Sequence, residues 1–96
     1  MAALPPSTIT FAIWGPIDRD DLPGLCDRVC ALLERSAASV ALCDVAGVAA
    51  NAVTVDALAR LQLAARRHRC LIRLQGASAG LQDLVVFMGL QDVLTS

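Results

Sequence analysis

The chain contains very few aromatic residues. Phenylalanine, tryptophan and tyrosine make up 3% of its 96 residues, and tyrosine is absent. Proteins that bind single-stranded nucleic acid stack bases on exposed aromatic side chains, so this composition argues against such a function. The formal net charge is −1, which gives no general attraction to nucleic acid or to an anionic membrane. We therefore expect no nucleic-acid partner.

Long apolar runs are missing as well. No apolar stretch approaches the roughly 20 residues that span a bilayer. The first ten residues, MAALPPSTIT, lack the basic start and long apolar centre of a signal peptide. These features predict a cytoplasmic protein with no membrane insertion. The sequence also lacks a low-complexity linker and a repeat of fixed period, and 56% of its residues are apolar, which predicts one domain over residues 1–96.

Residues that carry chemistry are scattered. Cys26 and Cys30 are one helical turn apart and could share a ligand, but there is no Cys-x-x-Cys, and Cys43 and Cys70 lie in apolar segments. We interpret all four as small hydrophobic residues and expect no metal. His68 sits among arginines with no nucleophile or acid placed beside it, and QGASAG lacks the Lys-Ser/Thr of a phosphate-binding loop. The sequence predicts neither an enzyme nor a cofactor.

Hydrophobic periodicity alternates along the chain between strand and helix. Strands and helices are expected in turn at residues 8–14, 22–35, 39–45, 53–67, 70–74 and 79–88. This order predicts βαβ units with right-handed crossovers and a largely parallel sheet. The near-continuous apolar run SVALCDV is typical of a strand that is buried on both faces. A hairpin within the first 17 residues would make the sheet mixed.

Several residues mark where helices begin and end. Asp20 or Asp21 can cap the first helix, and Pro23 fits its first turn. Ser78 can cap the third helix, and Gly89 suits the left-handed position that terminates it. The second helix ends in ARRHR, where positive charge complements the carbonyl end of the helix.

Four segments together resemble a known family. They are the opening strand that ends in Gly15-Pro16, VALCDVAGV with the loop after it, ALARLQLAARRHRCLIRLQGAS, and LQDLVVFMGLQDVL. The most specific pieces are Asp44-Val45-x-Gly47 and MGLQDV at residues 88–93. The pattern resembles STAS domains, the fold of bacterial anti-sigma factor antagonists, from about residue 8 to the end. The resemblance implies an α/β fold: a STAS-like sandwich with a mixed, mostly parallel β-sheet covered by α-helices.

The resemblance also implies a signalling switch that regulates transcription. In the family, an anti-sigma factor, which is a serine kinase of histidine-kinase-like ATPase fold, phosphorylates a serine in the loop after the central strand. Here Asn51 falls on the family's Asp position and Ala52 on its serine position. Neither these residues nor Val53 carries a hydroxyl, so the usual phosphorylation is not expected.

Three polar residues near this loop each have two interpretations. Thr54 is either a helix-capping residue, which we favour, or a displaced phosphoacceptor. Asn51 either caps the helix or closes an Asx turn, or it contacts a partner. Asp44 either takes part in acid–base chemistry or, as we favour, ends the strand by accepting hydrogen bonds from loop N–H groups.

The sequence thus predicts an anti-sigma factor antagonist-like binding module that docks an anti-sigma factor through the loop and helix at residues 48–58. The expected partner-binding residues are Asp44, Asn51, Ala52, Val53, Thr54 and Val55. The alternative is a STAS-type accessory subunit of a bacterial ABC lipid transporter, in which Thr54 supports assembly with the ATPase. A small-ligand sensor and a homodimer also remain open, the latter because the chain ends soon after Leu94 and could expose an edge for self-association.

Overall fold

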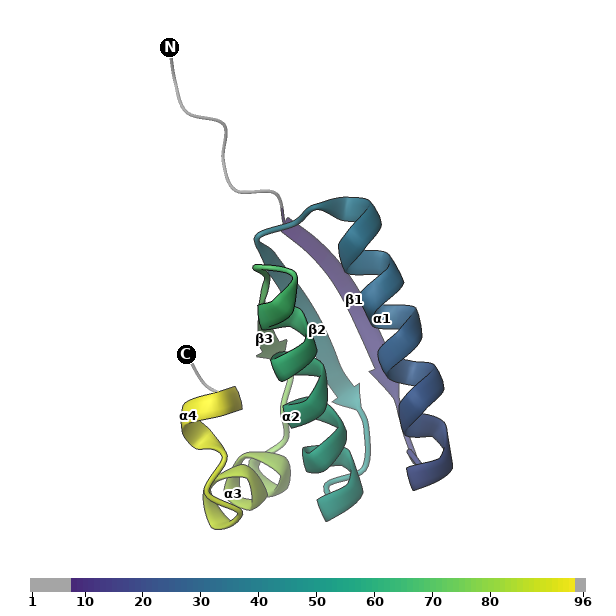
Figure 1. The fold of residues 1–96 in the computed structure, drawn as a ribbon. Helices are drawn as coiled ribbons and strands as arrows, with labels where there is room; N and C mark the ends of the chain where they lie inside the picture. The colour runs from purple at the N-terminus through teal and green to yellow at the C-terminus, as the bar shows by residue number, and fades with distance from the viewer. Residues whose placement is uncertain (1–7, 95–96) are drawn as a thin grey trace.

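The sheet is built from parallel strands connected by helices. The structure is a computed structural model that describes residues 8–94, and Figure 1 shows its elements. In chain order they are β1 (Thr8–Trp14), the short 3-10 helix η1 (Arg19–Asp21), α1 (Leu22–Ser36), β2 (Val40–Gly47), α2 (Ala52–Arg67), β3 (Leu71–Gln75), α3 (Ala79–Phe87) and α4 (Gln91–Leu94). The expected alternation of strand and helix is confirmed, with boundaries close to those expected from periodicity.

The strand order is β1-β2-β3, and both neighbouring pairs are parallel. Phe11, Cys43 and Leu74 lie at one level across the three strands. The sheet was expected to be mixed, but the strands within residues 8–94 are all parallel. Most of the partner strand of the expected hairpin falls on residues 1–7, outside the described residues.

The helices cover only one face of the sheet (Figure 1). On that face Ala41, Cys43 and Val45 of β2 are buried, whereas Asp44 and Ala46, which point the other way, are exposed. The prediction that this strand is buried on both faces was therefore wrong. The physical reason is the strand order: two successive right-handed crossovers in the same direction place both connecting helices on the same side of the sheet.

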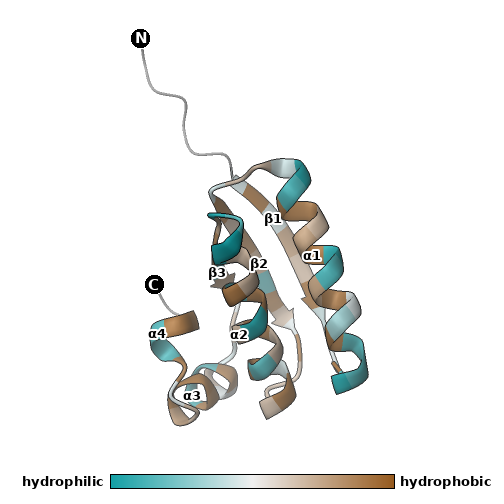
Figure 2. Ribbon diagram, viewed as in Figure 1, coloured by the Kyte–Doolittle hydropathy of each residue, from teal (hydrophilic) through white to brown (hydrophobic). Residues whose placement is uncertain are grey.

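Helix α2 is the centre of the helical layer, and it packs against α1, β3, α3 and α4. Its buried residues are Thr54, Val55, Ala57, Leu58, Ala59, Leu61, Gln62 and Ala65. The outer face of α1 and the end of α2 are hydrophilic in Figure 2, as expected for helices with one buried stripe. No helix within residues 8–94 is both long enough and apolar enough to cross a membrane.

Four of the five expected helix signals are confirmed, including Pro23 in the first turn of α1 and the basic last turn of α2, and the aspartate cap is not. The Ser78 hydroxyl accepts a hydrogen bond from the Leu81 N–H at 3.1 Å, and Gly89 has a φ of 72°. Asp21 occupies the position before α1, but its carboxylate does not cap that helix. It instead accepts a hydrogen bond from the Asp18 N–H at 3.1 Å, because η1 precedes α1 and needs its own stabilisation.

A buried glutamine forms hydrogen bonds with the backbone groups at the outer edge of β3. The Gln62 side chain is 1% exposed. Its Oε1 accepts a hydrogen bond from the Ile72 N–H at 2.9 Å, and its Nε2 donates to the Ile72 carbonyl at 2.8 Å. The same Nε2 donates to the Val93 carbonyl of α4 at 3.1 Å. Among residues 8–94 no strand pairs with this edge of β3, and one side-chain amide takes that place and also attaches α4 to the core.

We expect Gln62→Leu to lower the free energy of unfolding by about 2 to 4 kcal/mol, because it leaves the N–H and C=O of Ile72 buried without partners. Chemical denaturation measures the change. Gln82→Leu is the matched control, since that exposed side chain makes one hydrogen bond, to the Ala77 carbonyl. It should shift stability by no more than about 0.5 kcal/mol. Equal effects of the two substitutions would contradict the role assigned to Gln62.

Candidate functional site

Three loops meet at the carboxyl end of the parallel strands. They follow β1, β2 and β3, and the loop after β2 (residues 48–51) lies in the middle because β2 is the central strand (Figure 1). Open parallel α/β sheets bind their ligands at this end. The fold therefore places the loop that the sequence singled out at the end of the sheet where binding sites form.

The central loop has a close backbone contact with the β1 loop and a looser side-chain neighbour on α3. The Gly15 N–H donates a hydrogen bond to the Gly47 carbonyl at 3.1 Å, which ties the β1 loop to the start of the β2 loop. A Cβ on Gly15 would lie 2.9 Å from the Ala49 nitrogen, so only glycine permits this approach. On the other side, Gly80 of α3 faces Ala50. The loop is thus shaped before any partner arrives.

Asn51 caps helix α2. Its Oδ1 accepts a hydrogen bond from the Thr54 N–H at 2.9 Å, and its backbone carbonyl accepts one from the Val55 N–H at 3.2 Å. Asn51 is nevertheless exposed, and so is Ala52, which follows it at the first position of the helix. The capping interpretation of Asn51 is confirmed, and its location also leaves it accessible to a partner.

Thr54 lies in the core. The residue is 0% exposed, and its Oγ1 has no hydrogen-bond partner among the described residues. The favoured interpretation, that this hydroxyl caps the helix, was wrong: Asn51 provides the cap, and Thr54 takes part through its backbone N–H. As a phosphoacceptor, Thr54 would require the first turn of α2 to open, because a phosphate dianion in an apolar core is strongly unfavourable.

The six expected partner-binding residues are divided among four environments. Asp44 is exposed on the uncovered face of the sheet, where its Oδ1 accepts a hydrogen bond from the Ala46 N–H at 2.9 Å. That bond agrees with the strand-ending role. Val53 is half-buried, and Val55, like Thr54, is fully buried. Only Asn51 and Ala52 lie on the exposed loop, so we define the loop surface as the exposed residues 49–52.

An ion-pair cluster that the sequence analysis missed borders the loop surface. Asp56 in α2 accepts a hydrogen bond from Arg60 at 3.1 Å, and Arg19 of η1 lies 3.7 Å from the same carboxylate oxygen. The spacing of Asp56 and Arg60 is a signal in the sequence, whereas the approach of Arg19 depends on the fold. Exposed pairs of this kind contribute little stability, but they connect η1 to the start of α2.

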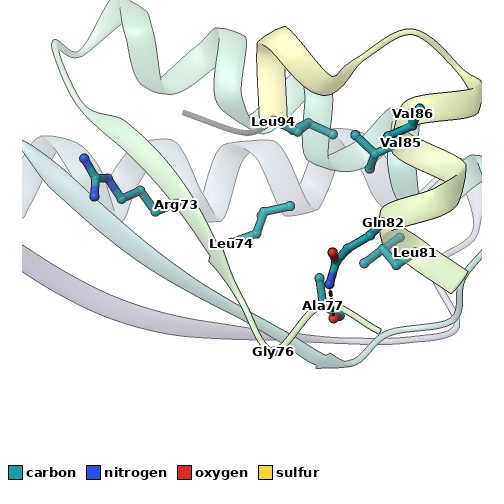
Figure 3. A pocket seen from close by; sticks show the side chains of 9 residues that line it. All are labelled: Arg73, Leu74, Gly76, Ala77, Leu81, Gln82, Val85, Val86 and Leu94. Atoms are coloured by element: carbon teal, nitrogen blue, oxygen red, sulfur yellow. Dashed lines mark hydrogen bonds between the residues drawn. The ribbon is translucent and has the colours of Figure 1, made fainter. Parts of the chain in front are cut away.

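A groove of about 490 Å³ lies between β3, the loop after it, α3 and α4 (Figure 3). Leu74, Leu81, Val85 and Leu94 supply most of its apolar wall, and Arg73 points away from them along the strand. At its rim, Gln82 donates a hydrogen bond to the Ala77 carbonyl. The lining holds no pair of titratable groups suited to acid–base chemistry.

Cys43 and Cys70 are buried as hydrophobic residues are, whereas Cys26 and Cys30 of α1 are half-buried. Burial, with a smaller contribution from the Asp44 carboxylate, raises the pKa of the Cys43 thiol to about 12. Burial also raises the pKa of Cys70 and, together with the nearby Cys30, that of Cys26. These thiols therefore stay protonated at neutral pH and are poor nucleophiles. Within residues 8–94 there is no group of three or more His, Cys, Asp or Glu side chains that could hold a metal ion.

Comparison with known proteins identifies the fold. No protein-family model matches the chain, and no curated protein matches it. Among solved structures, the crystal structure of a sulfate transporter family protein from Wolinella succinogenes is similar, with a TM-score of 0.69 and 21% sequence identity. The similarity covers 97% of this chain and 75% of that one. At this identity the likeness shows the fold alone, and it confirms the STAS-like α/β architecture.

We expect Thr54→Val to raise the free energy of unfolding by about 1 kcal/mol or more, because it keeps the side-chain shape and removes a buried hydroxyl that no group of residues 8–94 pairs with. Thermal or urea unfolding measures this change. Thr10→Val, at an exposed position of β1, is the control and should change stability by no more than about 0.5 kcal/mol. A loss of stability in Thr54→Val would show that the hydroxyl has a partner in solution.

Proposed function

We propose that this chain is an anti-sigma factor antagonist-like binding module, not an enzyme, whose loop surface docks a histidine-kinase-like ATPase in the cytoplasm. The observation that carries the proposal is the chemistry of the start of α2. Ala52 occupies the exposed first helical position, where the family's phosphoacceptor would lie, and the nearest following hydroxyl, that of Thr54, is buried. A module of this kind binds its partner without being released by phosphorylation.

The loop surface suits docking for energetic reasons. Alanine has no side-chain rotamers to immobilise, so ordering Ala49, Ala50 and Ala52 against a partner has almost no side-chain entropy cost. The close approach of Gly15 and its hydrogen bond to Gly47 restrict the start of the loop backbone. Preorganisation of this kind lowers the cost of association, which leaves more of the contact energy available as affinity.

Charge beside the loop surface favours a basic partner. Asp18, Asp20 and Asp21 are exposed on or next to η1. Arg19, between them in the sequence, lies close to Asp56 near the start of α2, which places this acidic segment beside the loop surface. Complementary charge accelerates association, and the rate should fall as salt is added.

The alternative is an accessory subunit of a bacterial ABC lipid transporter. The similar solved structure is described as a sulfate transporter family protein, a description that names neither a lipid nor an ATPase. In that role the module would bind the transporter ATPase. In that role the Thr54 hydroxyl was expected to support assembly with the ATPase, and the burial of Thr54 weighs against such a contact. Affinity purification of the tagged full chain from native lysate, with mass spectrometry, separates the two functions by the ATPase that is recovered.

We expect Ala52→Glu to weaken binding to the recovered ATPase by at least about tenfold, since it places a bulky charge within the proposed interface. The fold should survive, because a carboxylate at the first turn complements the helix dipole. Ala31→Glu, at an exposed position of α1, is the matched control and should bind like the unmodified chain. Calorimetric titration measures both. Unchanged affinity in Ala52→Glu would place the interface elsewhere.

We further expect no phosphate on this chain after incubation with ATP and the histidine-kinase-like partner. A serine substituted at the exposed site, Ala52→Ser, should accept phosphate under the same conditions, because it restores a hydroxyl at the first position of α2. Intact-mass spectrometry distinguishes the two chains by the mass of one phosphoryl group. Phosphate mapped to Thr54 in the unmodified chain would overturn the constitutive-binding proposal.

A further inference from the structure

The face of the sheet opposite α1 and α2, which we call the open face, has no covering element among the described residues. Side chains from all three strands form it, and its apolar members are Ala12, Trp14, Val40, Leu42, Ala46 and Leu71. Trp14, the single tryptophan of the chain, is 76% exposed. Its indole lies against Gly47, where a Cβ would approach it to 2.6 Å. An exposed tryptophan on a partly apolar face is typical of a surface that binds another protein.

Two charges on this face have opposite signs. Asp44 and Arg73 are exposed on neighbouring strands, and neither forms an ion pair within residues 8–94. In the register of β2 and β3, Leu42 is level with Arg73, and Asp44 is level with Gln75. The acid therefore lies on β2 one position beyond the Cys43–Leu74 level, and the base lies on β3 one position before it.

This spacing is self-complementary. Consider a second copy laid face to face on the first, with a two-fold axis that crosses the strands at the level of Cys43 and Leu74. The rotation brings Arg73 of the second copy to the level of Asp44, one strand away, and symmetry forms the same pair again. Packed sheets lie about 10 Å apart, a gap that an arginine and an aspartate side chain span together.

We propose that a second copy of this chain covers the open face, with two reciprocal Asp44–Arg73 ion pairs and with Trp14 buried against the opposing β1. The proposal is independent of the partner proposed for the loop surface. The charges of the open face favour a second copy as the occupant, because each copy supplies both the acid and the base that the other copy needs. A partner with only one sign of charge on its surface would leave one of the two residues unpaired.

The size of the face sets the strength of the dimer. Three strands about 4.8 Å apart and about 25 Å long give a face of roughly 350 Å² for each copy. Two copies thus bury on the order of 700 Å², short of the ~1,200–2,000 Å² of stable interfaces. The dimer should therefore be weak and reversible, and its population should rise with protein concentration.

Sedimentation velocity over a range of concentrations tests the proposal on the full chain, with Trp14 fluorescence recorded on the same samples. We expect a monomer–dimer equilibrium and a blue shift of the emission as dimer forms. Asp44→Arg alone and Arg73→Asp alone should each weaken dimerisation at least about tenfold, because each turns two attractive pairs into repulsive ones. An equimolar mixture of the two variants should dimerise again, since both pairs then join opposite charges.

Leu63→Glu is the matched control, because Leu63 is an exposed apolar residue on α2, on the helical side of the molecule. It should dimerise like the unmodified chain. Circular dichroism confirms the fold of each variant, and Arg73→Asp leaves the hydrogen bond between Asp44 and Ala46 intact. Three results would overturn the proposal. The first is a monomer at every concentration, whether its emission is that of an exposed indole or is already blue-shifted. The others are dimerisation that neither charge reversal weakens, and a mixture of the two variants that stays monomeric.

Discussion

The handedness of the two crossovers determines most of what this molecule can present to a partner. A chain that adds parallel strands in the order β1-β2-β3 through right-handed connections must place α1 and α2 on the same face. The core then forms on that side alone, where Ala41, Cys43 and Val45 are buried. The same constraint gathers three loops at one end of the sheet and places no helix of residues 8–94 on the opposite face. The loop surface and the open face thus both follow from one topological rule.

The central position of α2 explains why the hydroxyl of Thr54 is hidden. Helix α2 touches α1, β3, α3 and α4, so its inner side and both flanks are buried. A residue at its third position points into this layer, whereas Ala52, half a turn earlier, points to solvent. The first position of α2 is exposed and carries a methyl group in place of a hydroxyl. This is the arrangement on which the proposal of a module that binds without regulation by phosphate rests.

The sequence predicted those parts of the structure that local rules determine. Strand and helix positions follow from periodicity, and Ser78 and Gly89 follow from the steric and hydrogen-bonding needs of helix ends. The burial of Thr54 was also within reach, because Thr54, Leu58, Leu61 and Ala65 share one face of the helix at spacings of four, three and four. The preference of threonine for helix N-termini suggested instead that its hydroxyl caps α2, because that preference reflects only the residue type and its neighbours in sequence.

Other features depend on tertiary structure and had no local signal. The apolar strand around Cys43 looked buried on both faces, but burial depends on where the crossovers place the helices. Gln62 would be read as a polar interruption of the apolar face of α2, and its role appears only when β3 is known to be an edge strand. The approach of Arg19 to Asp56 likewise requires η1 and α2 to be placed together first.

The two proposed surfaces are neighbours, and this has a consequence for how they act together. Trp14 on the open face lies against Gly47, and Gly47 accepts the hydrogen bond from Gly15 that holds the base of the β2 loop. Glycine at residue 47 is what permits this arrangement, since a Cβ there would displace the indole. A molecule that covers Trp14 therefore restricts the residue from which the loop surface extends. A side chain at residue 47 would therefore alter both proposed surfaces, the open face through the indole and the loop surface through the residue from which it extends.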